Sequence, residues 1–355
     1  MTARHLFSGN NALAEGAIQA GCDAYFGYPI TPQNEVPEYF ARRMAEEGRV
    51  FVQSESELAA ISMVMGAAAT GMRAMTSSSS PGISLMQEGI SYLSGCGLPA
   101  VIANVVRAGP GLGGIGPGQC DYFQAVKGGG HGDYHLHVLA PATVQETFDF
   151  MFLAFDLAFK YRNPVLILTD GLLGQMMEPL EIREPSHLRI PGVSFERASW
   201  ALTGAQDRPG RHFKSLHLDT HVLEEHNRAL QRKFAAMAAD VRFDTHKADD
   251  AAYLFVAYGI SARICRAAVD TMRSQGIAAG LLRPITLWPY PIQWLRDRTP
   301  WLKKVMAVEL SHGQMIEDVE RAVAGQCPVS FFGRTGGCVM TAEELVEAAV
   351  KEFDL

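Results

Sequence analysis

The sequence predicts an α/β protein in which a largely parallel sheet carries helices on both faces and is followed by a second, smaller α/β unit. Two observations predict this fold. Short apolar runs alternate with longer helical segments over residues 1–170, as expected for a parallel sheet whose crossovers are helices. The alternation stops in a stretch of prolines, histidines and mixed charge, and it resumes after residue 250. We therefore expect a first domain at 1–190, a connecting arm at 191–249 and a second domain at 250–355.

The strands of the first domain should be short apolar runs bounded by turn or helix signals. They are expected at 24–28, 50–53, 73–76, 100–106, 135–140 and 164–170. Helices should lie between them, at 12–20, from Thr31 onward, and at 58–71, 83–95 and 144–162. Asn10 or Asn11 should cap the first helix. Thr31 should cap the second, with Pro32 at the first helical position, where an N–H group is not needed.

The second domain repeats this pattern on a smaller scale. Its strands are expected at 253–259, 278–285, 303–310 and 328–333, with helices from Ser261, after Gly313 and from Thr341. The arm should contain one helix near 221–239. Both domains are thus expected to be layered sheets covered by helices.

Composition excludes several classes of protein. The 355 residues are 48% hydrophobic and 19% charged, which is enough apolar material for a large core. The formal net charge is −7, so we expect no nucleic-acid partner. No apolar run approaches the about 18 residues of a membrane span, and the first residues lack the apolar region of a secretory signal. We expect a cytoplasmic protein without a membrane partner.

The six cysteines are scattered, and no C-x-x-C motif occurs. This spacing does not indicate a disulfide framework, a structural zinc site or an iron–sulfur cluster, because metal-binding thiolates are normally clustered. We expect this chain to hold no metal of its own.

Residues 107–134 contain ten glycines and show neither helical nor strand periodicity. A loop of this length in a compact domain is usually functional. It includes a literal G-x-G-x-x-G at 111–116, with Asp133 about 20 residues further on, which superficially resembles a dinucleotide-binding fingerprint. Pro117 stands where the phosphate-binding helix should begin, so nucleotide binding is not expected there.

Four side chains are candidates for chemistry, and each also has a structural interpretation. Thr31 reads as a helix cap, and Glu57 as the partner of Ser54 in a capping box. Arg107 follows an apolar strand into the glycine-rich loop, where it could clamp a ligand carboxylate or form a salt bridge. His131 lies among glycines, so it could approach a ligand closely or simply stabilise the loop.

Five segments occur in a characteristic order: GYPITPQ at 27–33, QSESELAA at 53–60, SSSPGISL at 78–85, RAGPG at 107–111 and KGGGHGD at 127–133. Taken together, they resemble the alpha subunit of 2-oxoacid:ferredoxin oxidoreductases, which are thiamine diphosphate enzymes. A sixth segment, Leu-Arg-Pro-Ile-Thr-Leu-Trp-Pro at 282–289, extends the resemblance into the second domain. Within the family, the serine run before Pro81 and the Gly-Gly-Ile after Arg107 look most like the short alpha subunits that act on 3-methyl-2-oxobutanoate.

The resemblance implies a pyrimidine-binding domain followed by a transketolase-C-like domain. It implies that Glu57 bonds the pyrimidine ring and is the catalytic acid–base group. Tyr28, Pro29 and Ser80 would also contact the cofactor. The substrate-binding residues would be Thr31, Arg107 and His131.

The resemblance also implies partners. A beta subunit would hold the diphosphate through Mg²⁺, and 4Fe–4S clusters would lie in partner subunits only, among them a gamma and a ferredoxin-like delta subunit. The assembly would convert a branched-chain 2-oxoacid and coenzyme A to acyl-CoA and CO₂, and it would reduce external ferredoxin. Two alternatives stay open: a subunit acting on 2-oxoglutarate or another 2-oxoacid, and a non-catalytic scaffold subunit.

Overall fold

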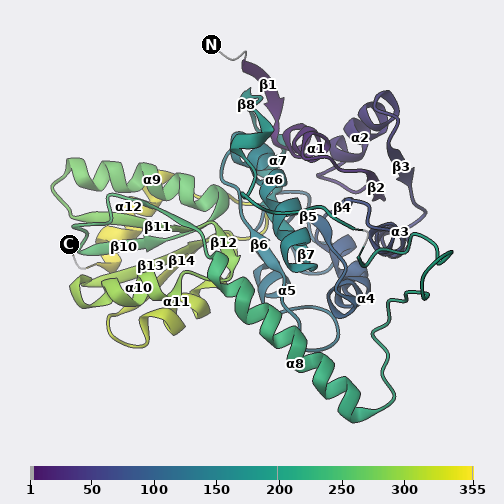
Figure 1. The fold of residues 1–355 in the computed structure, drawn as a ribbon. Helices are drawn as coiled ribbons and strands as arrows, with labels where there is room; N and C mark the ends of the chain where they lie inside the picture. Colours follow the sequence, from purple (N-terminus) through teal and green to yellow (C-terminus); the bar gives the residue numbers. More distant parts are fainter. Residues whose placement is uncertain (1–3, 198, 354) are drawn as a thin grey trace.

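The computed structural model describes residues 4–197, 199–353 and 355. Seven strands form the sheet of the first domain: β2 (Ala24–Gly27), β3 (Val50–Gln53), β4 (Ala74–Ser78), β5 (Ala100–Val106), β6 (His137–Leu139), β7 (Pro164–Asp170) and β12 (Thr286–Trp288). Their spatial order is β12-β6-β7-β5-β4-β2-β3 (Figure 1). All neighbours run parallel except β12, which pairs antiparallel with β6.

Helices cover both faces of this sheet, as expected (Figure 1). Successive residues of a strand point to opposite faces, so Tyr25 and Met75 enter one core cluster while Ala24 and Ala74 enter the other. The first face is covered by α1 (Gly9–Gln19), α2 (Glu35–Glu46), α6 (Val144–Tyr161) and the short α7 (Gly171–Gln175). The second face is covered by α3 (Glu57–Ala69), α4 (Pro81–Cys96) and α5 (Tyr122–Val126).

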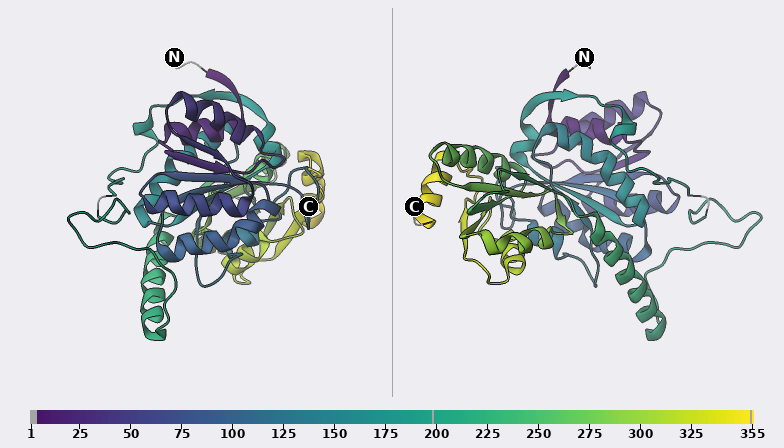
Figure 2. Two further views of the ribbon diagram at one scale, coloured as in Figure 1. Left: turned by 90° about the vertical axis from the view of Figure 1, so that its right-hand side faces the viewer. Right: turned by 60° about the vertical axis from the view of Figure 1, so that its left-hand side comes forward.

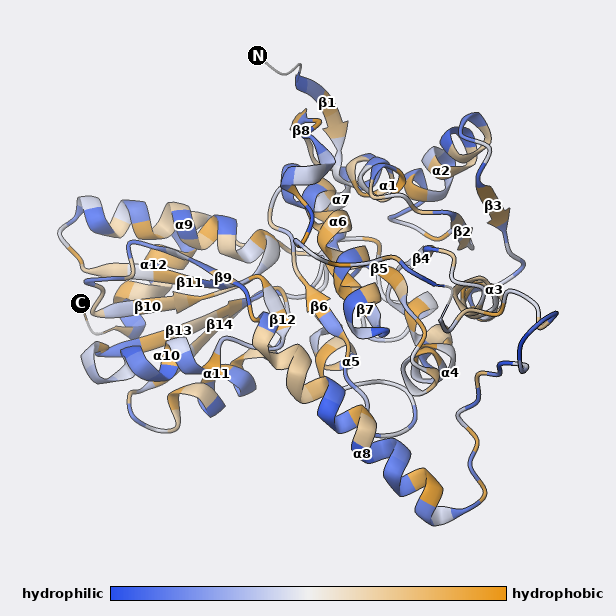
Figure 3. Ribbon diagram, in the orientation of Figure 1, coloured by the Kyte–Doolittle hydropathy of each residue, from blue (hydrophilic) through white to orange (hydrophobic). Residues whose placement is uncertain are grey.

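A second sheet contains β9 (Phe243–His246), β10 (Tyr253–Val256), β11 (Ala279–Pro284), β13 (Lys304–Glu309) and β14 (Val329–Gly333). Its order is β14-β13-β10-β11-β9, and β9 is antiparallel to β11. One face is covered by α9 (Gly259–Ser274) and α12 (Ala342–Glu352), the other by α10 (Ile292–Arg298) and α11 (Met315–Val323). The α10–α11 face shares one continuous core cluster with the α3–α4 side of the first sheet. The strands of both sheets carry much of the hydrophobic sequence (Figure 3).

Two of the expected helix caps are wrong. Ser8 caps α1 by accepting a hydrogen bond from the backbone N–H of Asn11, so neither Asn10 nor Asn11 is the cap. The second helix begins at Glu35 rather than after Thr31. Residues 31–34 form a turn instead, because the Thr31 carbonyl accepts from Arg107 and the Gln33 side chain is drawn into the core, where Ser77 Oγ donates to its Oε1 at 2.6 Å.

Four strands and three short helices, α5, α7 and α10, have no counterpart in the sequence-based expectation. β1 (Arg4–Ser8) and β8 (Met177–Glu181) form a separate two-stranded ribbon. β9 lies within the expected arm yet pairs in the second sheet, and β12 joins the first sheet from within the second sequence unit. α5 lies inside the glycine-rich stretch, which lacked helical periodicity. These elements are short, and the strands among them are stabilised by pairing with strands far away in the sequence.

The arm contains the expected helix, α8 (Thr220–Met237), which projects from the body of the molecule (Figures 1 and 2). Phe234 and Met237, near its carboxyl end, are buried, whereas most of its other residues are exposed or half-buried. Short 3₁₀ turns lie at Pro185–His187, Ala238–Asp240 and Thr299–Trp301. No helix among the described residues is long and apolar enough to cross a membrane.

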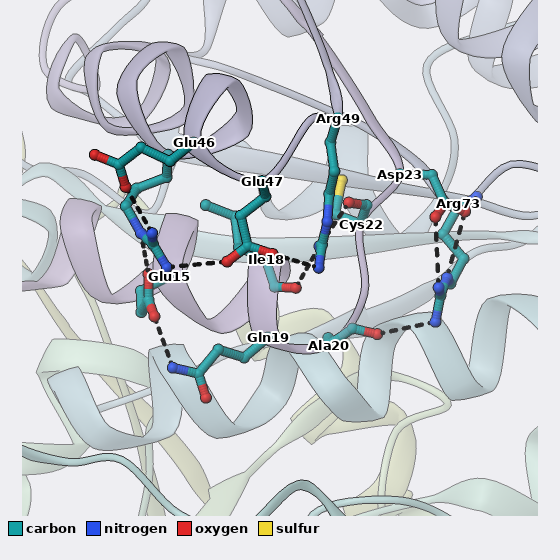
Figure 4. Close-up of polar contacts among 11 residues, drawn as sticks. Glu15, Ile18, Gln19, Ala20, Cys22, Asp23, Glu46, Glu47, Arg49 and Arg73 are labelled. Carbon is teal, nitrogen blue, oxygen red and sulfur yellow. Dashed lines mark hydrogen bonds and ion pairs between the residues drawn. The ribbon is translucent and has the colours of Figure 1, made fainter.

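Charged side chains fasten the amino ends of β2 and β4 (Figure 4). Arg49 donates to the carbonyl oxygens of Ile18 and Cys22, at 2.7 and 3.0 Å. Arg73 pairs with Asp23 across the start of the two strands. These bonds tie α1 to the sheet at the edge opposite to the loops described below, so we interpret them as structural.

His137 in β6 is completely buried against the end of α8, and its Nε2 lies 3.2 Å from the Met237 carbonyl oxygen. Burial lowers the pKa of His137 from 6.5 to about 4, and this outweighs the opposing effect of Asp240. The unfolded chain therefore binds a proton here near pH 6.5, whereas the folded chain does so only near pH 4. We expect the free energy of unfolding to fall as the pH drops through this window, by at most about 3 kcal/mol.

Urea unfolding of the purified chain and of His137→Gln, from pH 7 to pH 4.5, measures this contribution. The variant lacks the titrating imidazole, so its free energy of unfolding should depend less steeply on pH. His221→Gln, on the exposed amino end of α8, should keep the parent slope. Equal slopes for all three chains would contradict the expectation.

Candidate functional site

The loops that follow β2, β3, β4 and β5 meet at one edge of the first sheet. These four strands are neighbours in the order β5-β4-β2-β3, and the carboxyl ends of parallel strands open toward the same side. The sequence-predicted residues Tyr28, Pro29 and Thr31 follow β2, Glu57 follows β3, Ser80 follows β4 and Arg107 follows β5. The structure therefore brings all of the predicted site residues except His131 to one edge.

Glu57 is the first residue of α3, and only 6% of it is exposed. Ser56 is the helix cap, because its Oγ accepts from the backbone N–H of Ala59 at 3.2 Å. The capping box expected between Ser54 and Glu57 is therefore wrong, and Ser54 Oγ is buried without a hydrogen-bond partner. The Glu57 carboxylate is not used to cap its own helix.

Instead, the Glu57 side chain reaches the first turn of α4, at Gly82. A Cβ atom on Gly82 would lie 2.6 Å from Glu57 Oε1 and 2.1 Å from Ser78 Oγ. Only glycine leaves room for both groups. Ser78 Oγ is itself buried without a partner, so the carboxylate lies beside an unsatisfied hydroxyl. The buried polar atoms around Glu57 are a feature of binding sites rather than of an apolar core.

Arg107 is buried, with 7% of its surface exposed, and it makes no ion pair with a carboxylate among the described residues. Its Nη1 donates to the Thr31 carbonyl and its Nη2 to the Leu112 carbonyl, each at 3.0 Å, while Nε has no partner. The other buried arginine of the described chain, Arg283, is also 7% exposed but pairs with Glu146 at 2.7 Å. A buried guanidinium without an anion is costly, so Arg107 is poised to bind one.

A hydrogen-bond chain holds the Arg107 backbone. Ser80 Oγ accepts from the Arg107 N–H at 3.1 Å, and the Ser80 N–H donates to Asn104 Oδ1 at 3.0 Å. Asn104 Nδ2 in turn donates to Asp121 at 2.8 Å, and burial raises the pKa of Asp121. The sequence reasoning missed Asn104 and Asp121. The available signal was that Asn104 is the one polar residue in the apolar strand 100–106.

A cavity of about 560 Å³ opens beyond Ser80, between the first domain and the loops after β13 and β14. Among the residues that the structure describes, no lysine or arginine lines it. Its polar walls come from both domains and include Ser80, Ser84, Cys120, Asp121, His312 and Gln314. The cavity could accept an uncharged part of a ligand.

Tyr28 and Pro29 are exposed at the outer side of the edge, next to the end strand β3. His131 lies elsewhere. Its loop packs against the middle of α4, where Gly130 lies against Gln87, and the His131 side chain is exposed. The structure does not bring His131 to Arg107 and Glu57, since the loop turns away along α4 after residue 127.

Two family models match the chain. One, described as pyruvate flavodoxin/ferredoxin oxidoreductase, thiamine diphosphate-binding, matches residues 15–227, and pyruvate:ferredoxin oxidoreductase core domain II matches residues 251–345. The chain belongs to the 2-oxoacid:ferredoxin oxidoreductase family. The edge that carries Thr31, Glu57 and Arg107 thus lies within the thiamine diphosphate-binding domain of a 2-oxoacid:ferredoxin oxidoreductase.

Two relatives match this chain over nearly its whole length. The chain is 50% identical over 346 residues to ketoisovalerate oxidoreductase subunit VorB of Methanothermobacter thermautotrophicus, covering 97% of both chains. It is 35% identical over 376 residues to 2-oxoglutarate synthase subunit KorA of the same organism, covering 99% of both chains. These two relatives support the family placement independently of the family models.

Solved structures support the fold. The chain matches 2-oxoglutarate:ferredoxin oxidoreductase of Magnetococcus marinus with a TM-score of 0.87 and 24% identity, over 99% of this chain and 66% of that one. It matches a split-gene transketolase with a TM-score of 0.60 and 15% identity, over 98% and 99% of the two chains. The predicted fold class, a pyrimidine-binding domain followed by a transketolase-C-like domain, is confirmed.

The residues at this edge fit one half of thiamine diphosphate. The pyrimidine ring needs a buried carboxylate, and Glu57 beside the unpartnered Ser78 hydroxyl offers one. This carboxylate suits the pyrimidine end of the cofactor.

Proposed function

We propose that this chain is the alpha-type subunit of an oxidoreductase that converts 3-methyl-2-oxobutanoate and coenzyme A to acyl-CoA and CO₂ and reduces ferredoxin. The observation that carries the proposal is Arg107, a buried guanidinium at the same sheet edge as Glu57 that has no carboxylate partner in the described part of the chain. A 2-oxoacid supplies the missing carboxylate.

Each residue at the edge has a distinct task in this proposal. Arg107 binds the substrate carboxylate, and Thr31, whose carbonyl holds Arg107 Nη1, shares in orienting it. Glu57 holds or donates a proton at the pyrimidine ring nitrogen. Tyr28, Pro29 and Ser80 would contact the cofactor. Bound thiamine diphosphate supplies an electron sink for decarboxylation. His131 is not assigned a substrate contact here, because it lies away from these groups.

A branched aliphatic substrate is favoured over 2-oxoglutarate by two observations. The chain is 50% identical to a ketoisovalerate oxidoreductase subunit and 35% identical to a 2-oxoglutarate synthase subunit of the same organism. The cavity beside Ser80 also has no lysine or arginine in its walls, whereas a second carboxylate would need a cation. His312 is the one lining side chain that could carry a positive charge.

A beta subunit is proposed to dock on the outward face of α3 and α4 and to supply the Mg²⁺-bound diphosphate site. After Glu57, α3 contains no charged residue, although Leu58, Ser62 and Gly66 along its outer face are exposed. On α4, Leu85 and Tyr92 are 57% and 40% exposed. Exposed apolar faces of this kind mark protein interfaces. The face flanks Glu57, so a subunit seated there would bring its groups to the pyrimidine site.

The remaining partners belong to the same proposal. The 4Fe–4S clusters would be carried by the partner subunits, which include gamma and ferredoxin-like delta subunits, and external ferredoxin would accept the electrons. All six cysteines of this chain are free thiols, as suits a reducing compartment, and we propose that the assembly works in the cytoplasm.

Purification of the tagged chain from its native host, followed by assays with coenzyme A and a one-electron dye, tests the proposal. We expect iron-containing partners to copurify and dye reduction to show a higher kcat/KM with 3-methyl-2-oxobutanoate than with 2-oxoglutarate or pyruvate. A preference for 2-oxoglutarate would overturn the substrate assignment alone. Copurifying partners without dye reduction by any 2-oxoacid would favour the scaffold alternative.

A further inference from the structure

The loop that begins at Arg107 closes on itself and ends at Gln119. Arg107 and Pro117 form an isolated antiparallel bridge. The N–H of Ala108 donates to the Gly116 carbonyl at 2.9 Å, and the N–H of Gly114 donates to the Ala108 carbonyl at 2.8 Å. Because the two ends of the loop are bonded to each other, a displacement of its second end is transmitted to Arg107.

Gln119 fixes that second end to the second domain. Only 2% of Gln119 is exposed, and its backbone N–H donates to the Leu310 carbonyl at 2.8 Å. Its Nε2 donates to the Tyr258 carbonyl at 3.0 Å, and its Oε1 accepts from the Leu310 N–H at 2.9 Å and from Ser261 Oγ at 2.7 Å. The Tyr258 hydroxyl donates to the Gln119 carbonyl at 3.2 Å. All of these partners lie in the second domain, after β10 and β13.

The loop also rests on the second domain directly. Gly116 and Gly337 lie so close that a Cβ atom on Gly116 would be 2.8 Å from the Gly337 Cα atom. The loop therefore touches the second domain at Gly116 and at Gln119, whereas the Arg107 guanidinium is held in the first domain by Thr31. The position of the loop depends on both domains.

Other bonds between the domains lie farther from Arg107. Within α5, the Phe123 N–H donates to Gln314 Oε1 at 2.8 Å, and the Tyr122 hydroxyl donates to Asp318 at 2.8 Å. These bonds act on α5, beyond the closed loop. They provide a matched control for bonds that hold the domains together without closing the Arg107 loop.

We propose that Gln119 is a positioning residue through which the second domain sets the place of the Arg107 guanidinium relative to the substrate carboxylate. This inference rests on the proposed function, in which Arg107 binds that carboxylate. Gln119 touches neither substrate nor cofactor. Loss of the Gln119 side chain should raise the KM for the 2-oxoacid more than it lowers kcat, because the contacts that hold Glu57 do not involve Gln119.

The test uses the assembled enzyme with Gln119→Met, which keeps the volume and removes the side-chain hydrogen bonds. We expect the KM for the 2-oxoacid to rise about tenfold while kcat changes less than threefold and the KM for coenzyme A stays the same. Gln119→Glu retains both acceptor bonds but turns a carboxylate oxygen toward the Tyr258 carbonyl, so the KM for the 2-oxoacid should rise with it as well. It also serves as the readout if Gln119→Met does not assemble. Tyr122→Phe should leave all three constants unchanged.

The outcomes separate this inference from the proposed function. If Arg107→Lys raises the KM for the 2-oxoacid and neither Gln119 variant does, the positioning role is wrong and the proposed function stands. If thermal stability falls in the Gln119 variants with no change in KM, Gln119 is only structural and the inference is again overturned. If Arg107→Lys itself leaves KM unchanged, the proposed carboxylate site fails, and the inference fails with it.

Discussion

Glu57→Gln should lower kcat of the assembled enzyme by about 10²-fold or more, the range found when a positioned acid–base group is removed. Glutamine has the same shape and fits the space between Gly82 and Ser78, so the fold should tolerate the change. It can no longer exchange a proton as a carboxylate does. The measurement is steady-state dye reduction with the 2-oxoacid and coenzyme A, together with the amount of thiamine diphosphate retained by the complex.

A neighbouring carboxylate provides the control. Glu55 precedes the same helix but is exposed, so Glu55→Gln removes one negative charge from the same loop without touching the buried site. It should keep the parent kcat within about twofold, since an exposed charge is screened by solvent. If Glu57→Gln were as active as Glu55→Gln while the cofactor was still bound, the acid–base role of Glu57 would be wrong.

The sequence contains enough information to place most of this edge. Apolar runs marked the strands that precede Glu57, Ser80 and Arg107, and the parallel-sheet rule then put the residues after them on one side. That inference needs only local patterns. Local patterns alone also gave the wrong cap at Thr31. Two tertiary contacts override the local preference for capping there: Arg107 donates to the Thr31 carbonyl, and Ser77 donates to Gln33.

The parts that could not be predicted depend on contacts between distant residues. Gln119 bonds Tyr258 and Leu310, which are 139 and 191 positions away, and no pattern near Gln119 announces either bond. The place of His131 was also beyond the reach of local patterns. Its glycine-rich surroundings indicated close approach to a ligand, but the path of the loop along α4 decides where it lies, and glycines do not encode that path.

Arg107→Lys should raise the KM for the 2-oxoacid and lower kcat/KM by about 10²-fold, the loss expected when hydrogen bonds to a charged group are removed. Lysine keeps the charge but has a single donor centre. It cannot reach the carbonyls of Thr31 and Leu112 at once and still present two parallel N–H groups to a carboxylate. The KM for coenzyme A should not change, because only the 2-oxoacid carries the carboxylate that Arg107 is proposed to bind.

Arg283→Lys is the matched control, since Arg283 is as buried as Arg107 but already has Glu146 as its anion. This substitution should lower the thermal stability of the enzyme and leave the KM for the 2-oxoacid within about twofold, because a lysine pairs less well with Glu146 and the loss falls on folding free energy rather than on substrate affinity. The two substitutions thus compare a buried arginine that lacks a carboxylate partner among the described residues with one that has such a partner. If both variants raised the KM to the same extent, the effect would come from disturbed packing, and the buried charge of Arg107 would need another explanation.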